Sequence, residues 1–245
     1  MSPFTEHLHT RALMDAYCDG TSLAKAMMRK ALERVRGTQE KFRPAASYNG
    51  LLVYDSPELN GGGKRFRRLY SRVLLRMGWK RCNRIFEFCA GPGYIGYSLL
   101  AHGFSESLTL ADINLRAVLA ARHTAKHNGI EDRVTVYESD CLDGIPPSEK
   151  WDLVVGIPPN FSPLDDRDDL MLLDRGWALH RRFYAGIKPF MTAGGLVILV
   201  EHEEASNPGI FAPMIEAGGG KVGAVIVECD LTGDSEGVYF MVGHW

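Results

Sequence analysis

The sequence lacks the patterns that mark zinc proteins, disulfide-rich proteins and membrane proteins. Its five cysteines are scattered along 245 residues without a Cys-x-x-Cys pair, which excludes the common spacings of zinc ligands and of a disulfide framework. No apolar run reaches the ~18 residues that a membrane-spanning helix needs, and Met1 is not followed by a basic and apolar leader. We therefore expect reduced thiols, no bound metal, no membrane contact and a cytoplasmic location.

The sequence also lacks an excess of charge of one sign. It has 28 Lys and Arg against 30 Asp and Glu, which gives a formal net charge of −2. Proteins that bind nucleic acids usually present a basic face, so this balance disfavours a nucleic-acid partner but leaves a local basic patch open. Apolar residues make up 45% of the chain, enough for one good core. We predict one domain over residues 66–245 after an N-terminal extension over residues 1–65, and the sequence leaves a homodimer open.

The N-terminal extension combines a helical pattern with a glycine-rich stretch. Apolar residues recur at helical spacing over residues 7–37, which predicts two helices. Residues 44–64 are rich in Pro, Asn and Gly and predict an irregular, mobile loop. A helix with basic residues on its exposed side is predicted over residues 66–77. We expect the first two helices and the glycine loop to cover the functional site as a lid.

Beyond residue 84, short apolar runs alternate with longer amphipathic ones, which is the pattern of an α/β protein with a mainly parallel sheet. Parallel strands buried on both faces should be apolar throughout, and the Leu-Val-Ile-Leu-Val run that ends at residue 200 fits this rule. The predicted strands cover residues 84–88, 107–111, 134–137, 153–155 and 196–200, and the predicted helices cover residues 95–101, 115–127 and 172–187. Two last strands, at residues 221–228 and 237–243, should form an antiparallel pair at the sheet edge.

The strongest motif runs from Ile85 to Gly96, where an apolar strand is followed by a turn of small residues and then by a helix. Small residues let a ligand approach the backbone, and open parallel sheets bind ligands beyond the carboxyl ends of their strands. The glycine spacing alone fits a dinucleotide cofactor, another adenosine ligand or a tight turn without a ligand. Asp112 ends the next strand about twenty residues downstream, where an acceptor for ribose hydroxyls is expected with either cofactor.

Several motifs in this order resemble the class I S-adenosylmethionine-dependent methyltransferases. Glu87 precedes the glycines, a third strand ends near Asp140, and a fourth is followed by Pro158-Pro159, as in the branch with an (Asn/Asp/Ser)-Pro-Pro-(Tyr/Phe) motif. The resemblance extends over residues 84–200. It implies a Rossmann-like fold with a mainly parallel seven-stranded sheet, an antiparallel C-terminal strand and helices on both faces, with S-adenosylmethionine as the cofactor.

The resemblance also implies which residues bind the cofactor. They are Glu87, Phe88, Cys89, Ala90, Gly91, Gly93, Asp112, Ile113, Asn114, Asp140, Cys141 and Gly156. In the family's arrangement, the turn that starts at Glu87 lines the methionine end and Asp112 holds the ribose hydroxyls. Ile113 and Asn114 flank the adenine, whose edge is bound by Asp140 with Cys141. Cys89 departs from the family, because a glycine is usual there, and it places a Cβ near the cofactor.

The Pro-Pro motif departs from the family at two positions. Ile157 replaces the residue whose amide accepts a hydrogen bond from the target nitrogen, and Asn160 replaces an aromatic residue. Since Ile cannot accept a hydrogen bond, the mechanism used on nucleobases and glutamine cannot be transferred intact. We predict that Pro158, Asn160 and Phe161 contact the acceptor. In the alternative interpretation, the two prolines only end a strand and stiffen a loop.

Charged residues near the predicted site leave further interpretations open. The acidic run at residues 165–169 could attract a cationic amine or be a solvated face. The basic run at residues 64–68 could receive an acidic substrate or pair with the acidic run. His180 and His202 are candidates for a general base or ordinary packing residues.

Taken together, these patterns predict an S-adenosylmethionine-dependent methyltransferase that acts on an amine or amide nitrogen of a small molecule or of a protein side chain. Such an enzyme works chiefly by aligning donor and acceptor, so the lack of an evident nucleophile does not count against it. An NAD-dependent oxidoreductase is an alternative, but the Tyr/Lys or His pair that it needs is not evident. A methyltransferase fold that has lost transfer and binds the cofactor or a partner is a second alternative, which Ile157 and Asn160 keep open.

Overall fold

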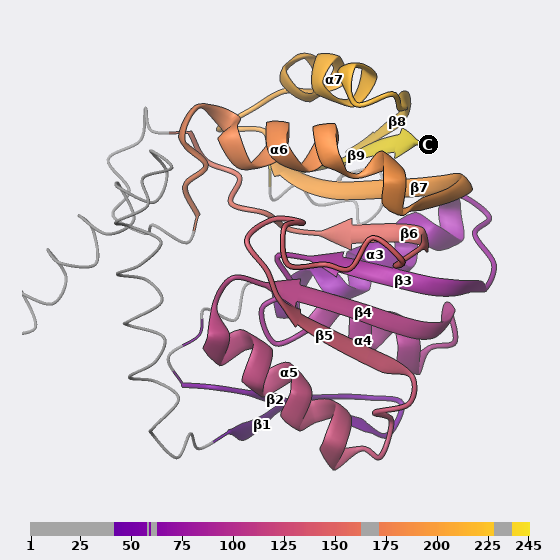
Figure 1. Cartoon of the computed structure of the whole chain (residues 1–245), viewed down its shortest axis with the longest axis vertical. Coiled ribbons are helices and arrows are strands. Elements are labelled where there is room, and N and C mark those ends of the chain that lie inside the picture. Colours follow the sequence, from indigo (N-terminus) through magenta and orange to yellow (C-terminus); the bar gives the residue numbers. More distant parts are fainter. Residues whose placement is uncertain (1–41, 58, 60–62, 163–171, 228–236) are drawn as a thin grey trace, which may run out of the picture.

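The structure, a computed structural model, describes residues 42–57, 59, 63–162, 172–227 and 237–245. Its centre is a seven-stranded sheet with the order β5-β4-β3-β6-β7-β9-β8 (Figure 1). The strands are β3 (Cys82–Phe88), β4 (Ser105–Asp112), β5 (Val134–Glu138), β6 (Trp151–Gly156), β7 (Met191–His202), β8 (Lys221–Val227) and β9 (Val238–His244). Strands β3 to β7 are parallel, and β9 is antiparallel to both β7 and β8. The predicted sheet with its antiparallel C-terminal pair is confirmed.

Side chains alternate between two apolar cores, one on each face of the sheet. Along β3, Ile85 packs into one core, whereas Phe86 and Phe88 pack into the other. Residues 196–200 of β7 alternate in the same way, and each of them is at least 95% buried. A strand buried on both faces must be apolar at consecutive positions, which explains the continuous apolar runs of the sequence.

Helices cover both faces of the sheet (Figure 1). On one face lie α3 (Gly63–Arg76), α4 (Tyr94–Ala101) and α5 (Leu115–His127), and on the other lie α6 (Ala178–Gly186) and α7 (Pro208–Ala217). The start of α5 follows from its sequence, because the side chain of Asn114 accepts a hydrogen bond from the Arg116 backbone N–H and caps the helix. Helices on both faces agree with the prediction.

The irregular loop predicted over residues 44–64 is wrong for residues 44–55, and residues 58 and 60–62 of it lie outside the described residues. The chain forms a two-stranded antiparallel hairpin there, made of β1 (Arg43–Tyr48) and β2 (Leu51–Asp55). Its turn is Asn49-Gly50, and both residues have positive φ, 48° and 89°, as a tight hairpin turn requires. The backbone N–H groups of Leu52 and Tyr54 donate to side chains of α5 and of the residue that follows it, so the hairpin is fastened to that helix.

Two further differences concern the C-terminal half. The helix predicted over residues 172–187 is shorter, because a 3₁₀ turn, η1 (Arg175–Trp177), precedes α6, and Gly176 and Trp177 have positive φ. Helix α7, which contains Pro213, was not predicted. The two helices predicted within residues 7–37 and the acidic run at residues 165–169 lie outside the described residues. Among the described helices, none is long and apolar enough to cross a membrane.

Candidate cofactor and acceptor site

The predicted site residues come together at the carboxyl ends of four neighbouring strands. Phe88 at the end of β3 is in register with Ala111 of β4 on one side and with Gly156 of β6 on the other. Asp112 of β4 is in register with Glu138, the last residue of β5. The ends of these strands therefore form one edge, which is where open parallel sheets bind their ligands.

The turn between β3 and α4 adopts a backbone that favours glycine at alternate positions. Cys89, Gly91 and Gly93 have φ values of 52°, 54° and 85°. A Cβ on Gly93 would lie 2.8 Å from the Tyr97 ring and 2.9 Å from Leu110, so the turn has no room for a side chain there. Cys89 occupies the same left-handed region with a Cβ, at a cost of roughly 1–2 kcal/mol. The structure thus gives a physical reason why glycine is usual at position 89 in the resembling family.

Glu87 holds this turn from within. Its carboxylate accepts hydrogen bonds from the backbone N–H groups of Gly96 at 2.7 Å and Ile95 at 3.4 Å, in the first turn of α4. Burial raises the pKa of Glu87 to about 8, and the two backbone N–H groups offset only part of this effect. The side chain is therefore directed toward α4, where it joins the end of β3 to the start of the helix.

Asp112 connects the end of β4 to the same turn. Its Oδ2 accepts a hydrogen bond from the Gly91 N–H at 2.7 Å, and its Oδ1 accepts one from the Asn114 N–H at 2.8 Å. Burial raises the pKa of Asp112, and the backbone donors partly offset the effect. A carboxylate offers about four acceptor positions, so two remain for the hydroxyls of a ribose.

Asp140 is held by a residue that the sequence did not reveal. Arg182 of α6 donates from one guanidinium nitrogen to Asp140 Oδ1 at 3.0 Å and from the other to Asp143 Oδ2 at 3.1 Å. The second oxygen of Asp140 remains available to a ligand. Cys141 follows at a φ of 53°, and burial raises the pKa of its thiol to about 12. No motif connects residues 140 and 182, so only the fold brings them together.

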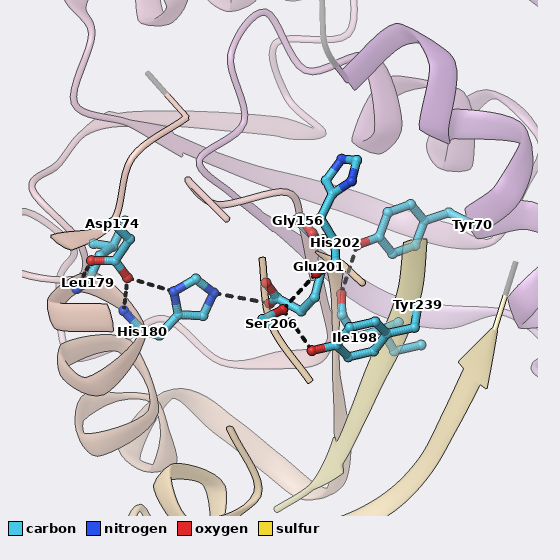
Figure 2. Close-up of polar contacts among 10 residues, drawn as sticks. All are labelled: Tyr70, Gly156, Asp174, Leu179, His180, Ile198, Glu201, His202, Ser206 and Tyr239. Carbon is cyan, nitrogen blue, oxygen red and sulfur yellow. Dashed lines mark hydrogen bonds and ion pairs between the residues drawn. The ribbon is translucent and has the colours of Figure 1, made fainter. Parts of the chain in front are cut away.

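Gly156 ends β6 and lies next to the turn between β3 and α4. A Cβ on Gly156 would lie 2.4 Å from the Phe88 carbonyl oxygen, so β3 and β6 can approach only because this residue is glycine. The Tyr70 hydroxyl of α3 hydrogen-bonds to Gly156 and to the Ile198 carbonyl, which ties α3 to β6 and β7 (Figure 2). Ile157 packs against the core on the α3 side.

Asn160 and Phe161 are both 2% exposed. The Asn160 side chain makes no hydrogen bond to another described residue, so its amide remains available to a bound molecule. Phe161 is fixed through its backbone, because its N–H donates to the Leu172 carbonyl and its carbonyl accepts from the Asp174 N–H. The ring of His202, at the end of β7, lies 4.9 Å from the ring of Phe161. These residues border the carboxyl edge on the β6–β7 side.

His180 is enclosed between two carboxylates (Figure 2). Its Nδ1 lies 2.7 Å from Asp174 Oδ2 and its Nε2 lies 3.0 Å from Glu201 Oε1, and the side chain is fully buried. Burial by itself lowers the pKa of His180, but the charges and hydrogen bonds of Glu201 and Asp174 outweigh it and raise the pKa to about 9. Both ring nitrogens are engaged, which argues against a role as general base. The sequence singled out His180 but gave no signal for its two partners.

A glycine turn, an acidic residue at the end of the next strand and a Pro-Pro segment at the switch between sheet halves define a class I methyltransferase fold. Residues 70–207 match the methyltransferase small domain family. Because this match covers more than half of the 245 residues, the chain belongs to that family of S-adenosylmethionine-dependent methyltransferases. Family membership makes S-adenosylmethionine the cofactor, and the alternative of an NAD-dependent oxidoreductase is set aside.

The names of curated proteins that are similar to this chain mention two kinds of methyl acceptor. The chain is 30% identical over 113 residues to the ribosomal RNA small subunit methyltransferase C of Actinobacillus pleuropneumoniae, covering 46% of this chain and 32% of that protein. It is 28% identical over 130 residues to the ribosomal protein uL3 glutamine methyltransferase of Francisella tularensis, covering 47% and 40%. It is 32% identical over 88 residues to the release factor glutamine methyltransferase of Leptospira interrogans, covering 36% and 30%. The matches thus span less than half the length of these relatives.

The solved structure of the 16S rRNA N2 G1207 methyltransferase of T. thermophilus, in complex with S-adenosylmethionine and guanosine, is also similar. The TM-score is 0.57 at 16% identity, covering 83% of this chain and 50% of that one. At this identity the likeness concerns the fold alone. It supports the Rossmann-like architecture of the described sheet and its flanking helices.

Proposed function

We propose that the chain transfers the methyl group of S-adenosylmethionine to an amide or amine nitrogen, on a protein side chain or on a small molecule. In this proposal the turn from Glu87 to Gly93 receives the methionine end of the cofactor, and Asp112 accepts hydrogen bonds from its ribose. Ile113 and Asn114 flank the adenine, and Asp140, held by Arg182 and followed by Cys141, accepts a hydrogen bond from the adenine amino group. These roles agree with the positions of the residues along one sheet edge.

One observation carries the proposed acceptor. The amide of Asn160 is buried beside the cofactor edge without a described hydrogen-bond partner, and it belongs to the segment that begins next to the Phe88 carbonyl. An amide oxygen can accept a hydrogen bond from an acceptor N–H, as can the Pro158 carbonyl. Together they would align the nitrogen lone pair with the methyl group, which is where most of the rate of such a displacement comes from. Asn160 would then accept, from a later position in the segment, the hydrogen bond that Ile157 cannot accept.

The names of the relatives support a nitrogen acceptor on a protein but do not restrict it. Two of the three act on glutamine side chains and the third on ribosomal RNA. We favour an amide or amine over RNA because the net charge of −2 provides no general attraction for a phosphate backbone. The proton released on transfer to nitrogen would pass to a carbonyl, a carboxylate or water at the same edge.

The experiment that tests the proposal separates cofactor binding from transfer. The protein is incubated with radiolabelled S-adenosylmethionine and three sets of acceptors, which are glutamine-containing peptides, small primary and secondary amines, and an RNA mixture. We expect label in the peptides or amines, loss of transfer in Asn160→Ala with cofactor affinity retained, and loss of cofactor affinity in Asp112→Ala. Label in RNA alone would refute the proposed acceptor. Tight cofactor binding without transfer to any set would favour the alternative of a fold that has lost transfer.

A further inference from the structure

Three buried ionisable side chains form a continuous chain behind the proposed acceptor segment, and they have no place in the function proposed above (Figure 2). We propose that His180 is a positioning residue that, as an imidazolium between Asp174 and Glu201, fixes the segment 156–161 relative to the end of β7. This inference rests on the proposed role of that segment in acceptor binding. It assigns His180 to acceptor geometry and not to proton transfer.

The contacts run without a gap from the acceptor segment to β7. The Phe161 carbonyl accepts from the Asp174 N–H at 2.8 Å, and the Asp174 carboxylate accepts from His180 Nδ1 at 2.7 Å. His180 Nε2 then reaches Glu201 Oε1 at 3.0 Å. The same Asp174 carboxylate accepts from the backbone N–H groups of Leu179 and His180, so it also holds the start of α6. Movement of His180 would therefore be passed directly to the backbone of Phe161.

The two buried carboxylates favour a cation at this position. Asp174 is 4% exposed and Glu201 is fully buried, and a buried carboxylate is unfavourable unless it is paired. Glu201 Oε2 has no hydrogen-bond partner in the described part of the chain, so His180 is the principal support of that carboxylate. Burial, only partly opposed by His180, raises the pKa of Glu201. With His180 as a neutral ring, two carboxylates would share this site with no compensating charge on the imidazole.

In the described part of the chain, the other titratable groups that face this cluster are three hydroxyls and the thiol of Cys89, whose pKa is raised by burial, with Asp174 adding to the effect. Tyr184 comes from α6, Tyr70 from α3 and Tyr239 from β9, and burial raises the pKa of each, with Glu201 adding to the effect. They stay protonated near neutral pH and contribute no charge. Among these groups, His180 is therefore the one that carries a positive charge near neutral pH.

The position of Phe161 affects the acceptor through its neighbour Asn160. Asn160 precedes Phe161 in the chain, so a shift of the Phe161 backbone displaces the Asn160 amide. A misplacement of about 1 Å in a reacting pair costs roughly a hundredfold in rate. We therefore expect loss of the His180 charge to lower kcat and to raise KM for the acceptor, while the affinity for S-adenosylmethionine changes less than about threefold.

The first test is independent of any acceptor. The ring nitrogens of His180 are observed by 15N NMR in the full chain over a pH series. We expect the imidazolium, with both nitrogens protonated, at pH 7.5, and deprotonation only near pH 9. A neutral ring at pH 7.5 would overturn the proposal, because the ion pairs that fix the segment would then be absent.

The second test measures the segment itself by hydrogen exchange. His180→Asn retains a donor toward Asp174 and His180→Gln retains one toward Glu201, and both remove the positive charge. We expect the Phe161 and Asp174 amides to exchange at least tenfold faster in both variants and to recover in part in His180→Gln/Glu201→Gln, which removes one carboxylate charge. His102→Gln, whose ring contacts the Ser98 carbonyl on α4, is the control and should change neither amide.

Each outcome bears on a separate claim. Unchanged exchange at Phe161 and Asp174 in folded variants overturns the positioning role. If the variants do not fold, the exchange of the same two amides is measured in the wild-type protein over a pH series and corrected for the chemical exchange rate. Protection of both amides should fall as His180 loses its proton. Constant protection would refute the proposal. Faster exchange combined with no methyl transfer by the wild-type protein leaves the positioning device intact and counts against the proposed function instead.

Discussion

Replacement of Asp112 gives the most direct test of the cofactor site. Its carboxylate holds the Gly91 and Asn114 N–H groups and has two acceptor positions left for ribose hydroxyls. A hydrogen bond to a charged group contributes about 1.5–3 kcal/mol, and two of them on a half-buried carboxylate together give on the order of 3 kcal/mol. We therefore expect Asp112→Ala to raise the Kd for S-adenosylmethionine about a hundredfold. Asp112→Asn keeps one acceptor oxygen and should raise it about tenfold.

Asp112 also supports the fold, so the effect on binding must be separated from an effect on stability. Asp152, at the opposite end of the sheet, provides a matched control because its Oδ2 accepts from the Asn83 and Arg84 N–H groups at 2.9 and 3.0 Å. Both alanine variants should lower the free energy of unfolding by roughly 2 kcal/mol through unpaired backbone donors. Only Asp112→Ala should weaken binding in calorimetric titration. Equal loss of affinity in both variants, or affinity within threefold of wild type in a folded Asp112→Ala, would refute the reasoning.

Three further predictions concern pH, the cofactor turn and the adenine end. Because the pKa of His180 is raised from 6.5 to about 9, its contribution of about 3 kcal/mol is complete below pH 6.5 and is lost as the pH rises through 9. Urea denaturation should therefore show a larger loss of stability over this range in the wild-type protein than in His180→Gln, which retains the titration of Glu87. Gly93→Ala should abolish cofactor binding and lower the thermal midpoint markedly, whereas Gly103→Ala, with positive φ but open space around the new Cβ, should cost only about 1 kcal/mol. Arg182→Ala should raise the Kd for S-adenosylmethionine by roughly three- to tenfold, because a half-exposed ion pair contributes about 1 kcal/mol; an unchanged Kd would show that Asp140 needs no support.

The strands and the turn between β3 and α4 could be predicted because their signals are local. A buried parallel strand is a run of apolar residues, and the turn from Glu87 to Gly96 is a contiguous motif whose backbone demands glycine or strain. The predicted bounds of α5 agree with the structure, in which Asn114 caps the first turn. These features need no knowledge of the rest of the fold.

The missed features depend on tertiary contacts or on short signals. Asn49-Gly50 is a hairpin turn, but the sequence on either side of it gave no clear strand pattern. The backbone N–H groups on one edge of β2 donate to side chains of α5 and of the residue after it, and not to a third strand. The partners of His180 lie 6 and 21 residues away, on separate elements, and their meeting follows only from the packing of α6 on β7. Helix α7 is short and contains Pro213, which normally argues against a helix.

The attachment of the β1–β2 hairpin also constrains the order in which the chain acquires its structure. The groups that secure β2 are Thr124 and Asn128, which lie 70 and 76 residues further along the chain. A two-stranded hairpin alone in water is marginally stable, and contacts between distant residues form slowly because the intervening loop must close first. During synthesis from the N-terminus, these strands are made before the helix that holds them. They can therefore be completed only after residue 128 has left the ribosome, so the earliest described strands are among the later ones to become stable.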